Sequence, residues 1–319
     1  MQGQDFHKEL NFAIRLAREA GGVSDCRLIY CIGIISEAFN SRQLAKVPIE
    51  FKVGPDQFDY TIKLNEADLV TKTDKLVEAK IFSALRLEFP DDHFIGEESV
   101  SSGNASVCKD VLGRIWIVDP IDGTTNFVHG LPFVCVSIAL FLNDEPVLGV
   151  VFNPILNELY HAVKGHGSFL NDVQLPLSKP AEFPERLSGC LIACEYGSDL
   201  RAEVMDKKLG TMNTLARAPV RGFRSFGSAA LECCYVAKGS LDAYYEAGVH
   251  IWDIAAGALI LTEAGGTFSN FGQEDFVRES KVDFRCRRFL AIRSCGHDNV
   301  RARSLVAPLL QNIELEKDE

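Results

Sequence analysis

The sequence has no apolar run long enough to span a bilayer, no Cys-x-x-Cys pair and no Gly-x-x-x-x-Gly-Lys-Ser/Thr phosphate loop. These absences argue against an integral membrane protein, a zinc ribbon and a nucleotidase of the P-loop type. A Gly-x-Ser-x-Gly motif is also missing, which argues against a serine hydrolase with a nucleophile elbow. Without internal repeats or low-complexity linkers, any boundary within the 319-residue chain is a tight one.

Basic residues are in the minority, with 33 lysines and arginines against 44 acidic residues and a formal net charge of −11. This balance argues against a nucleic-acid-binding surface and suits a protein that holds cations. The ten cysteines lack the spacing of a disulfide framework, and we interpret most of them as buried thiols in a reducing compartment. The N-terminal residues carry both charge signs at helical spacing, unlike a secretory signal or a transit peptide. We therefore expect a cytoplasmic protein that binds neither nucleic acid nor membrane.

Hydrophobic residues make up 47% of the chain, which is enough for a substantial core. Their spacing predicts a helix over residues 6–20 that ends at Gly21 and Gly22. A second helix is predicted over residues 68–89, with Pro90 as its stop.

Residues 23–33 interrupt this pattern. When the segment is removed, its flanks join into one continuous helical sequence, so we interpret it as an insertion. We expect it to affect the packing of the first helices, oligomerisation or the loop around Lys63 more than the chemistry.

Strand patterns become frequent after the second helix. Residues 94–96 form a short predicted strand that leaves Glu97 and Glu98 at its carboxyl end, and a meander of strands is predicted from residue 115 to residue 163. After a strand near residue 191, the chain alternates between helices predicted over residues 200–215, 229–237, 252–263 and 297–310 and strands predicted over residues 221–225, 241–246 and 289–294. This order indicates a layered α/β architecture.

The stretch IVDPIDGTTNFVHG, residues 117–130, concentrates oxygen ligands at the end of an apolar run. A strand rises about 3.3 Å per residue, so Asp119 and Asp122 cannot both face one ion from a straight strand. Pro120 and Gly123 predict a bend that turns both carboxylates inward. The stretch is therefore a candidate cation site.

Two further acidic residues are candidates for the same site: Glu97 at the end of a predicted strand and Asp253 at the start of a predicted helix. If they gather with Asp119 and Asp122, mutual repulsion raises the pKa values of all these carboxyl groups unless cations neutralise them. Oxygen ligands favour Mg²⁺ or Mn²⁺ over zinc, and two such ions about 3.5–4 Å apart suit phosphoryl transfer. Spacing alone leaves a second interpretation open, in which the aspartates cap a turn and Glu97 lies on a solvated corner.

A cysteine mechanism is the competing chemistry. Cys108 with Arg114, and Cys295 with Arg301, have the spacing by which cysteine phosphatases hold phosphate. Such loops are glycine-rich and open a helix, whereas Cys108 leads into a predicted strand and Cys295 lacks a glycine-rich cradle. We interpret both pairs as chance in a chain with ten cysteines.

Three motifs occur in a specific order along the chain: GEES at residues 96–99, WIVDPIDGTTN at 116–126 and WDIAAGALILTEAGG at 252–266. Between the last two lie GSAA at 227–230 and YYEAG at 244–248. Together they resemble the signature of the inositol monophosphatase family, over almost the whole chain apart from the insertion. The resemblance implies a five-layer αβαβα sandwich of the inositol monophosphatase and fructose-1,6-bisphosphatase type.

The resemblance also implies roles for individual residues. The family's Mg²⁺ ligands match Glu97, Asp119, the backbone carbonyl of Ile121, Asp122 and Asp253. The catalytic group matches Glu97 and Thr124, which orient the attacking water, Asp74, which supports Thr124, and Asp253, near the leaving oxygen. The substrate-binding positions match Asp122, Gly123, Thr124, Gly227, Ser228, Ala229, Glu246 and Asp253, with Lys63 near the mouth of the site.

The activity implied by this resemblance is Mg²⁺-dependent hydrolysis of myo-inositol monophosphates by direct attack of a metal-activated water. Two or three Mg²⁺ ions per active site, possible replacement by Mn²⁺, inhibition by Li⁺ and a homodimer are implied as well. Related substrates stay open: histidinol phosphate, phosphoadenosine phosphate or a sugar phosphate. A catalytically silent phosphate-binding or scaffold protein of the same fold also stays open, although every acidic ligand is present.

We expect one inositol-monophosphatase-like domain over residues 1–319. Its N-terminal half, residues 1–189, is expected to carry the first helices, the metal-binding turn and the large sheet. Its C-terminal half, residues 190–311, is expected to form a smaller α/β layer, followed by an acidic tail at 312–319.

Overall fold

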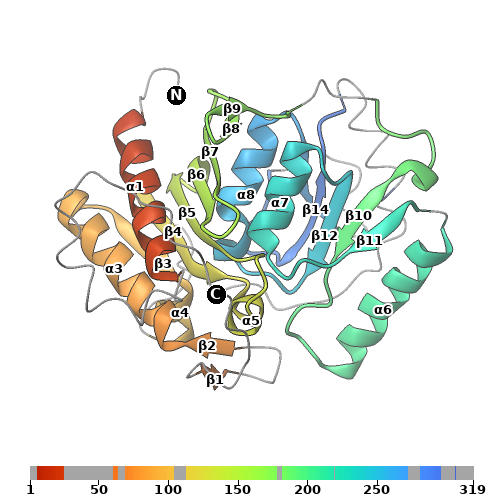
Figure 1. Cartoon of the computed structure of the whole chain (residues 1–319), viewed down its shortest axis with the longest axis horizontal. Helices are drawn as coiled ribbons and strands as arrows, with labels where there is room; N and C mark the ends of the chain where they lie inside the picture. The colour runs from red at the N-terminus through yellow and green to blue at the C-terminus, as the bar shows by residue number, and fades with distance from the viewer. Residues whose placement is uncertain are drawn as a thin grey trace.

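The computed structural model describes residues 6–24, 60–63, 69–103, 113–177, 182–218, 220–271, 281–295 and 306. Within these residues the chain forms the αβαβα layers that the family resemblance implies: helices, a seven-stranded sheet, helices, a five-stranded sheet and a helix (Figure 1). No helix in this part of the chain is long and apolar enough to cross a membrane.

The first layer consists of α1 (His7–Ser24) and α3 (Lys72–Glu88). Apolar side chains on both helices, such as Leu16 and Ile81, pack in one cluster with Trp116 of the large sheet. This face of the sheet is therefore covered by the N-terminal part of the chain.

The large sheet contains, in spatial order, β3 (His93–Gly96), β4 (Arg114–Asp122), β5 (Cys135–Leu142), β6 (Pro146–Asn153), β7 (Glu158–Val163), β8 (Ser168–Leu170) and β9 (Val173–Gln174). Strands β3 and β4 are parallel, and the remaining neighbours are antiparallel. Trp116 and Val118 of β4 pack with α1 and α3, whereas Ile115 and Ile117 pack in the cluster on the opposite face. Because both faces are covered, β4 is apolar along most of its length.

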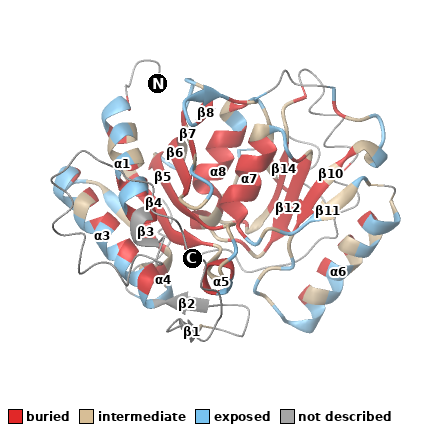
Figure 2. Cartoon of the chain, in the orientation of Figure 1, coloured by how far each residue is buried: buried red, intermediate tan, exposed pale blue. Residues whose placement is uncertain are grey.

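The central layer consists of α7 (Ala229–Lys238) and α8 (Ile251–Glu263), which are buried around almost their whole circumference (Figure 2). They are accordingly apolar on nearly all sides, as expected for helices enclosed by two sheets. At Gly149 of β6 a Cβ would come within 2.8 Å of the carbonyl oxygen of Ala256, so a glycine allows α8 to approach the sheet.

The small sheet contains β11 (Gly222–Arg224), β10 (Leu191–Cys194), β12 (Ala243–Ala247), β14 (Arg288–Ile292) and β13 (Thr267–Asn270) in spatial order. Tyr244 of β12 packs in the cluster with the central helices, whereas Tyr245 packs in the cluster with α6 (Ala202–Arg217) on the outer face. The strands of this sheet all follow residue 190. The division into two halves at that residue stays a prediction.

Short elements lie around the end of β4. They are β1 (Tyr60–Ile62), β2 (Leu69–Thr71), α4 (Glu97–Ser101) and α5 (Thr124–His129). The 3₁₀ turn η3 (Leu187–Gly189) precedes β10. Strands β1 and β2 form an antiparallel pair.

The predicted end of the first helix is wrong. Helix α1 continues through Gly21 and Gly22 to Ser24. A Cβ at Gly21 would come within 2.8 Å of the Phe152 ring. This glycine therefore serves close packing of α1 on β6 rather than helix termination.

The predicted start of the second helix is also wrong. Residues 69–71 pair with β1 as a strand, and α3 begins at Lys72. Leu76 is 62% exposed in spite of its apolar side chain, because the buried face of α3 includes Val77 and Ile81 instead.

Two other predictions lie largely outside the described residues. In the segment 23–33 only the last two residues of α1 are described, and in the predicted helix at 297–310 only Val306 is described.

Candidate active site

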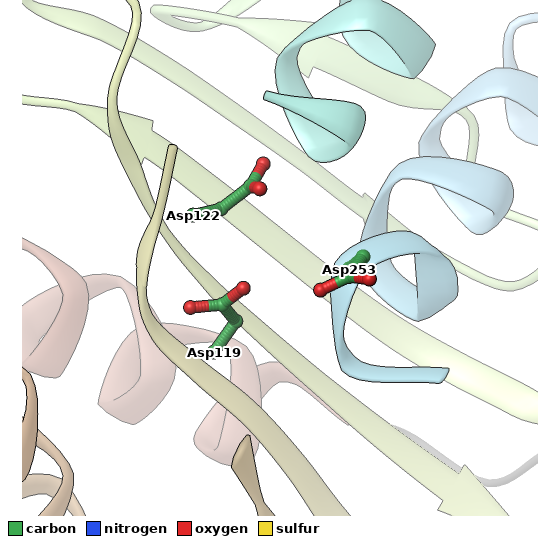
Figure 3. Close-up of side chains that lie close together, drawn as sticks. All are labelled: Asp119, Asp122 and Asp253. Carbon is green, nitrogen blue, oxygen red and sulfur yellow. The ribbon is translucent and has the colours of Figure 1, made fainter. Parts of the chain in front are cut away.

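Strand β4 carries Asp119 and Asp122 where its pairing with β5 shifts register. Asp119 pairs with Ser137 and Asp122 pairs with Cys135, so three steps along β4 correspond to two along β5. Residues at odd spacing point to opposite faces of a regular strand, and the extra residue of a bulge reverses that relation. The carboxylates of Asp119 and Asp122 therefore reach the same space (Figure 3), as the bend at Pro120 predicts.

Gly123 connects β4 to α5 in a left-handed conformation, with φ 88° and ψ 40°. A Cβ at this position would lie 2.7 Å from the carbonyl oxygen of Phe133 and 3.1 Å from that of Gly227. Both the dihedral angles and the available space therefore require glycine here.

Asp253 lies in the first turn of α8 and approaches from the opposite side (Figure 3). The backbone N–H of His250 donates to its Oδ2 over 2.7 Å, which fixes the orientation of the carboxylate. One oxygen from each of Asp119, Asp122 and Asp253 lies within 4.8 Å of the others. Three carboxylates from two elements far apart in the sequence thus meet at one point, as a hard cation requires.

Glu97 begins α4 beside this group but is not one of its three members. Its Oε1 lies 2.7 Å from Lys63 Nζ, which also contacts Glu98 Oε1 at 2.8 Å. Burial raises the pKa of Glu97 to about 7, and Lys63 opposes that shift. Glu97 is therefore held at the edge of the aspartate cluster by a lysine that the sequence analysis placed near the mouth of the site.

The electrostatics of the aspartates follow from burial and from each other. Burial, then Glu97, Asp122 and Asp253, raise the pKa of Asp119 well above its ordinary value. Burial, then Asp122 and Glu97, do the same to the pKa of Asp253. Burial raises the pKa of Asp122 to about 6 in spite of several hydrogen bonds. This is the mutual repulsion that a divalent cation relieves.

Asp122 also joins the turn between β4 and α5 to the N-terminus of α7. Its Oδ2 accepts from Ser228 Oγ at 2.6 Å and from the backbone N–H of Ala230 at 2.9 Å. The Sγ of Cys135 approaches the same oxygen at 3.7 Å. The carboxylate is thereby fixed between the large sheet and the residues that the resemblance assigns to substrate binding.

Thr124 lies at the start of α5, next to Asp74 on the first turn of α3. The Thr124 hydroxyl is 3.2 Å from Asp74 Oδ1 and 3.1 Å from the carbonyl oxygen of Ile121. The backbone N–H of Ile121 donates to Asp119 Oδ1 at 3.0 Å. The structure therefore brings Asp74 and Thr124 together beside the aspartates.

Glu246 lies on β12, at the other end of the site from α3, and is 7% exposed. The hydroxyl of Tyr244 donates to its Oε2 at 2.5 Å. Burial, followed by the charge of Glu195, raises its pKa to about 8, and Lys208 opposes this shift. With this pKa the carboxyl group can carry a proton at neutral pH, and it can then donate as well as accept hydrogen bonds.

Two residues that hold the site together had no role in the sequence analysis. Asn126 Nδ2 donates to the carbonyl oxygens of Phe133 at 2.9 Å and Phe226 at 2.5 Å, so it connects α5 to the turn before α7. Glu78 of α3 accepts from the Glu98 backbone N–H at 2.7 Å and from the Ser99 hydroxyl. A signal for Glu78 was available, because it is a charged residue on the apolar face of a helix.

The cysteine alternative finds no support in the described residues. Cys295 is 4% exposed, and its proposed partner Arg301 lies outside them, as does Cys108. The cysteines of the described part are all buried. Burial raises the pKa of Cys135, the one beside the aspartates, well above the ordinary value, so its thiol stays protonated.

Comparison with known proteins agrees with this geometry. The inositol monophosphatase family matches residues 32–311. Inositol monophosphatase 2 of Saccharomyces cerevisiae is 46% identical over 254 residues, covering 77% of this chain and 82% of that protein. Human inositol monophosphatase 1 is 36% identical over 310 residues, covering 97% of this chain and 96% of the human one.

A solved structure shares the whole fold. The extragenic suppressor protein SuhB from Bartonella henselae matches with a TM-score of 0.70 and 30% identity, covering 96% of this chain and all of that one. An inositol monophosphatase (IMPase) from Thermotoga maritima matches with a TM-score of 0.68 and 29% identity, over 95% of this chain and 99% of that one. With the acidic cluster, the layered fold and these relatives in agreement, the chain belongs to the inositol monophosphatase family, a family of phosphatases.

Proposed function

We propose that the protein hydrolyses myo-inositol monophosphates to inositol and phosphate with Mg²⁺ as its cofactor. The observation that carries this proposal is the convergence of Asp119, Asp122 and Asp253. Their raised pKa values and oxygen-only chemistry fit a hard divalent cation. The relatives named inositol monophosphatase support the choice of substrate.

The residues that would hold two or three Mg²⁺ ions are Glu97, Asp119, the carbonyl of Ile121, Asp122 and Asp253. When bound, such ions supply a water of lowered pKa and neutralise the charge of the phosphate. Mn²⁺ offers the same coordination chemistry and is the expected substitute.

Orientation of the attacking water falls to Thr124 and Glu97. Asp74 accepts from the Thr124 hydroxyl and so leaves the lone pairs of that oxygen to accept a hydrogen bond from the water. Glu97, the other member of this pair, would accept a hydrogen bond from the same water and help direct its attack. The backbone amides of Gly123 and Thr124 begin α5 and would bind phosphate oxygens, while Asp253 would help a water to protonate the leaving oxygen.

Recognition of the inositol ring is assigned to the wall of the site that the turn before α7 and strand β12 form. Gly227, Ser228 and Ala229 form the turn that leads into α7, and Glu246 lies on β12. A polyol offers both donors and acceptors, which suits backbone groups together with a carboxyl group whose pKa is about 8. Lys63 lies at the edge of the site beside Glu97.

The family resemblance extends the proposal to a homodimer in the cytoplasm that is inhibited by Li⁺. Sedimentation of the purified protein and activity in increasing LiCl test the first and last of these. A protein that sediments as a monomer, or that keeps its activity in LiCl, would contradict the corresponding part alone.

The substrate is tested with a panel of phosphomonoesters in the presence of Mg²⁺. We expect the highest kcat/KM for inositol 1-phosphate, ahead of histidinol phosphate and phosphoadenosine phosphate. A higher kcat/KM for either of the others would reassign the substrate, and no phosphate release from any would indicate a silent scaffold. Loss of activity in EDTA but not after thiol alkylation separates metal from cysteine catalysis.

A further inference from the structure

A second acidic cluster lies behind the wall assigned to the inositol ring. Glu195 follows β10, Glu232 lies on α7 and Glu246 lies on β12. Helix α7 and strands β10 and β12 lie side by side in Figure 1, and α7 contacts β12. Glu232 is fully buried at 0% exposure, whereas Glu195 is partly exposed.

Two of these carboxyl groups hold consecutive backbone amides of one turn. Glu232 accepts from the N–H of Phe226 at 3.2 Å, and Glu195 accepts from the N–H of Gly227 at 2.9 Å. The next residues, Ser228 and Ala230, donate to Asp122. The pair therefore anchors one side of a turn whose other side holds a carboxylate of the aspartate cluster.

The same two carboxyl groups are close enough to influence each other's pKa. Oε2 of Glu232 is buried and accepts no hydrogen bond from the described residues. Two carboxylates have only acceptor oxygens, so a bond between them requires one proton. An ionised Glu232 would be a buried charge beside another negative charge, which is strongly unfavourable.

The surroundings indicate which group carries the proton. Burial, then Glu195 and Glu246, raise the pKa of Glu232 well above its ordinary value. The other titratable groups around the pair include Tyr244 of β12, Tyr235 and Cys233 of α7 and Cys194 of β10, all with raised pKa values and therefore neutral. Lys208 of α6 interacts with Glu246 and Asp199 and donates to the carbonyl oxygen of Tyr196 at 2.5 Å.

We propose that Glu232 and Glu195 share one proton and act as a positioning pair for the turn that binds the inositol ring. The Glu232 carboxylic acid donates from Oε2 to the Glu195 carboxylate, and both groups then fix the amides of Phe226 and Gly227. Neither side chain touches the reacting atoms. The kinetic test of this inference rests on the proposed function, which assigns the turn to binding of the polyol.

The kinetic test uses the Mg²⁺-loaded enzyme with inositol 1-phosphate and compares Glu232→Gln with Glu232→Leu. Glutamine can donate to Glu195 and accept from Phe226, so Glu232→Gln keeps KM within about twofold of the native enzyme. Leucine removes both bonds, and we expect KM to rise about tenfold while kcat changes less than about threefold. Circular dichroism melting of each variant monitors the fold.

The matched control removes another carboxylate that accepts hydrogen bonds from two backbone N–H groups but lies outside the proposed site. Glu263, at the C-terminal end of α8, accepts from the N–H groups of Gly165 and Gly167, both at 2.9 Å. Glu263→Leu should leave KM unchanged. A Glu232→Leu enzyme with native KM, or a Glu232→Gln enzyme as impaired as Glu232→Leu, would overturn the proposal.

Infrared spectroscopy tests the shared proton even if Glu232→Leu does not fold. The Mg²⁺-loaded native protein at neutral pH should show a protonated carboxyl band that is missing in Glu232→Gln. Identical carboxyl regions in the two proteins would overturn the shared proton. If the native enzyme releases no phosphate from inositol 1-phosphate, the proposed function fails instead, and the infrared result stands by itself.

Discussion

Two buried acidic clusters in the described part of the chain differ in how their charge is relieved. The electrostatic partners of Asp119 and Asp253 are mainly other carboxylates, and each raises the pKa of the next. Around Glu246, by contrast, the chain supplies Lys208 and the hydroxyl of Tyr244. In the first cluster a divalent cation can relieve the repulsion between the carboxylates, whereas in the second a bound proton and neighbouring donors can do so.

Replacement of Asp119 by Asn is expected to have the largest effect, because it removes one charge from the cluster without changing its shape. We expect kcat for inositol 1-phosphate to fall by about 10³-fold or more, comparable with the loss of a strong transition-state contact. Phosphate release under saturating Mg²⁺ measures it. Full activity in this variant would contradict the assignment of the metal site.

The melting temperature of the same variant without metal tests whether the aspartates of the first cluster repel one another. Because burial and like charge raise the pKa of Asp119 in the folded state, its ionised form opposes folding. The metal-free Asp119→Asn protein should therefore melt at a higher temperature than the native one at pH 8. A lower melting temperature would show that the cluster is not repulsive.

Gly123→Ala should have the next largest effect, since it combines strain at φ 88° with a Cβ placed 2.7 Å from a carbonyl oxygen. We expect a loss of about 2–4 kcal/mol in the free energy of unfolding, together with reduced activity. Gly239→Ala is the matched control, because Gly239 has φ 87° and no atom within 4 Å of its Cβ position. It should lose only about 1 kcal/mol, without change in kcat. Equal losses in the two variants would show that space around Gly123 is not limiting.

Binding of Mg²⁺ should depend on pH. The carboxyl groups of Asp122 and Glu97, with pKa values of about 6 and about 7, must lose protons before they bind Mg²⁺. Both values lie above those of the unfolded chain, so the metal-free protein loses stability as pH rises from about 4 through this range. The rise in melting temperature on adding Mg²⁺ should therefore be several degrees larger at pH 8 than at pH 5.5. An equal or smaller rise at pH 8 would contradict this.

Lys208→Met should have the smallest effect, because Glu246 can take up a proton when its cation is removed. Lys208 lowers the pKa of Glu246, so the variant should keep that group neutral to higher pH. We expect KM for inositol 1-phosphate to change less than about threefold at pH 7 and kcat to stay constant. A large fall in kcat would place Lys208 in the catalytic machinery instead.

Local patterns were sufficient to predict a layered α/β architecture and the bend that brings Asp119 and Asp122 together. The mostly apolar β4, the bend at Pro120 and Gly123 and the signature motifs each reflect constraints within a few residues. Gly21 shows the limit of such patterns, because its role depends on contact with Phe152, which is remote in sequence.

The partners of the site residues were harder to predict for the same reason. Asn126, Glu78 and the pair of Glu195 and Glu232 act through bonds between elements that are distant in the chain. A charged residue within an apolar helical pattern marks Glu78 and Glu232 as unusual. The groups to which these two residues bond, however, become evident only in the packed structure of sheets and helices.

Calorimetric titration of Mg²⁺ into the metal-free protein at pH 6.5, with inorganic phosphate present, tests the central claim most directly. The account predicts saturable binding accompanied by proton release, seen as a dependence of the heat on the buffer, and much weaker binding in Asp119→Asn. Absence of Mg²⁺ uptake by the native protein, or equal uptake by the variant, would contradict it.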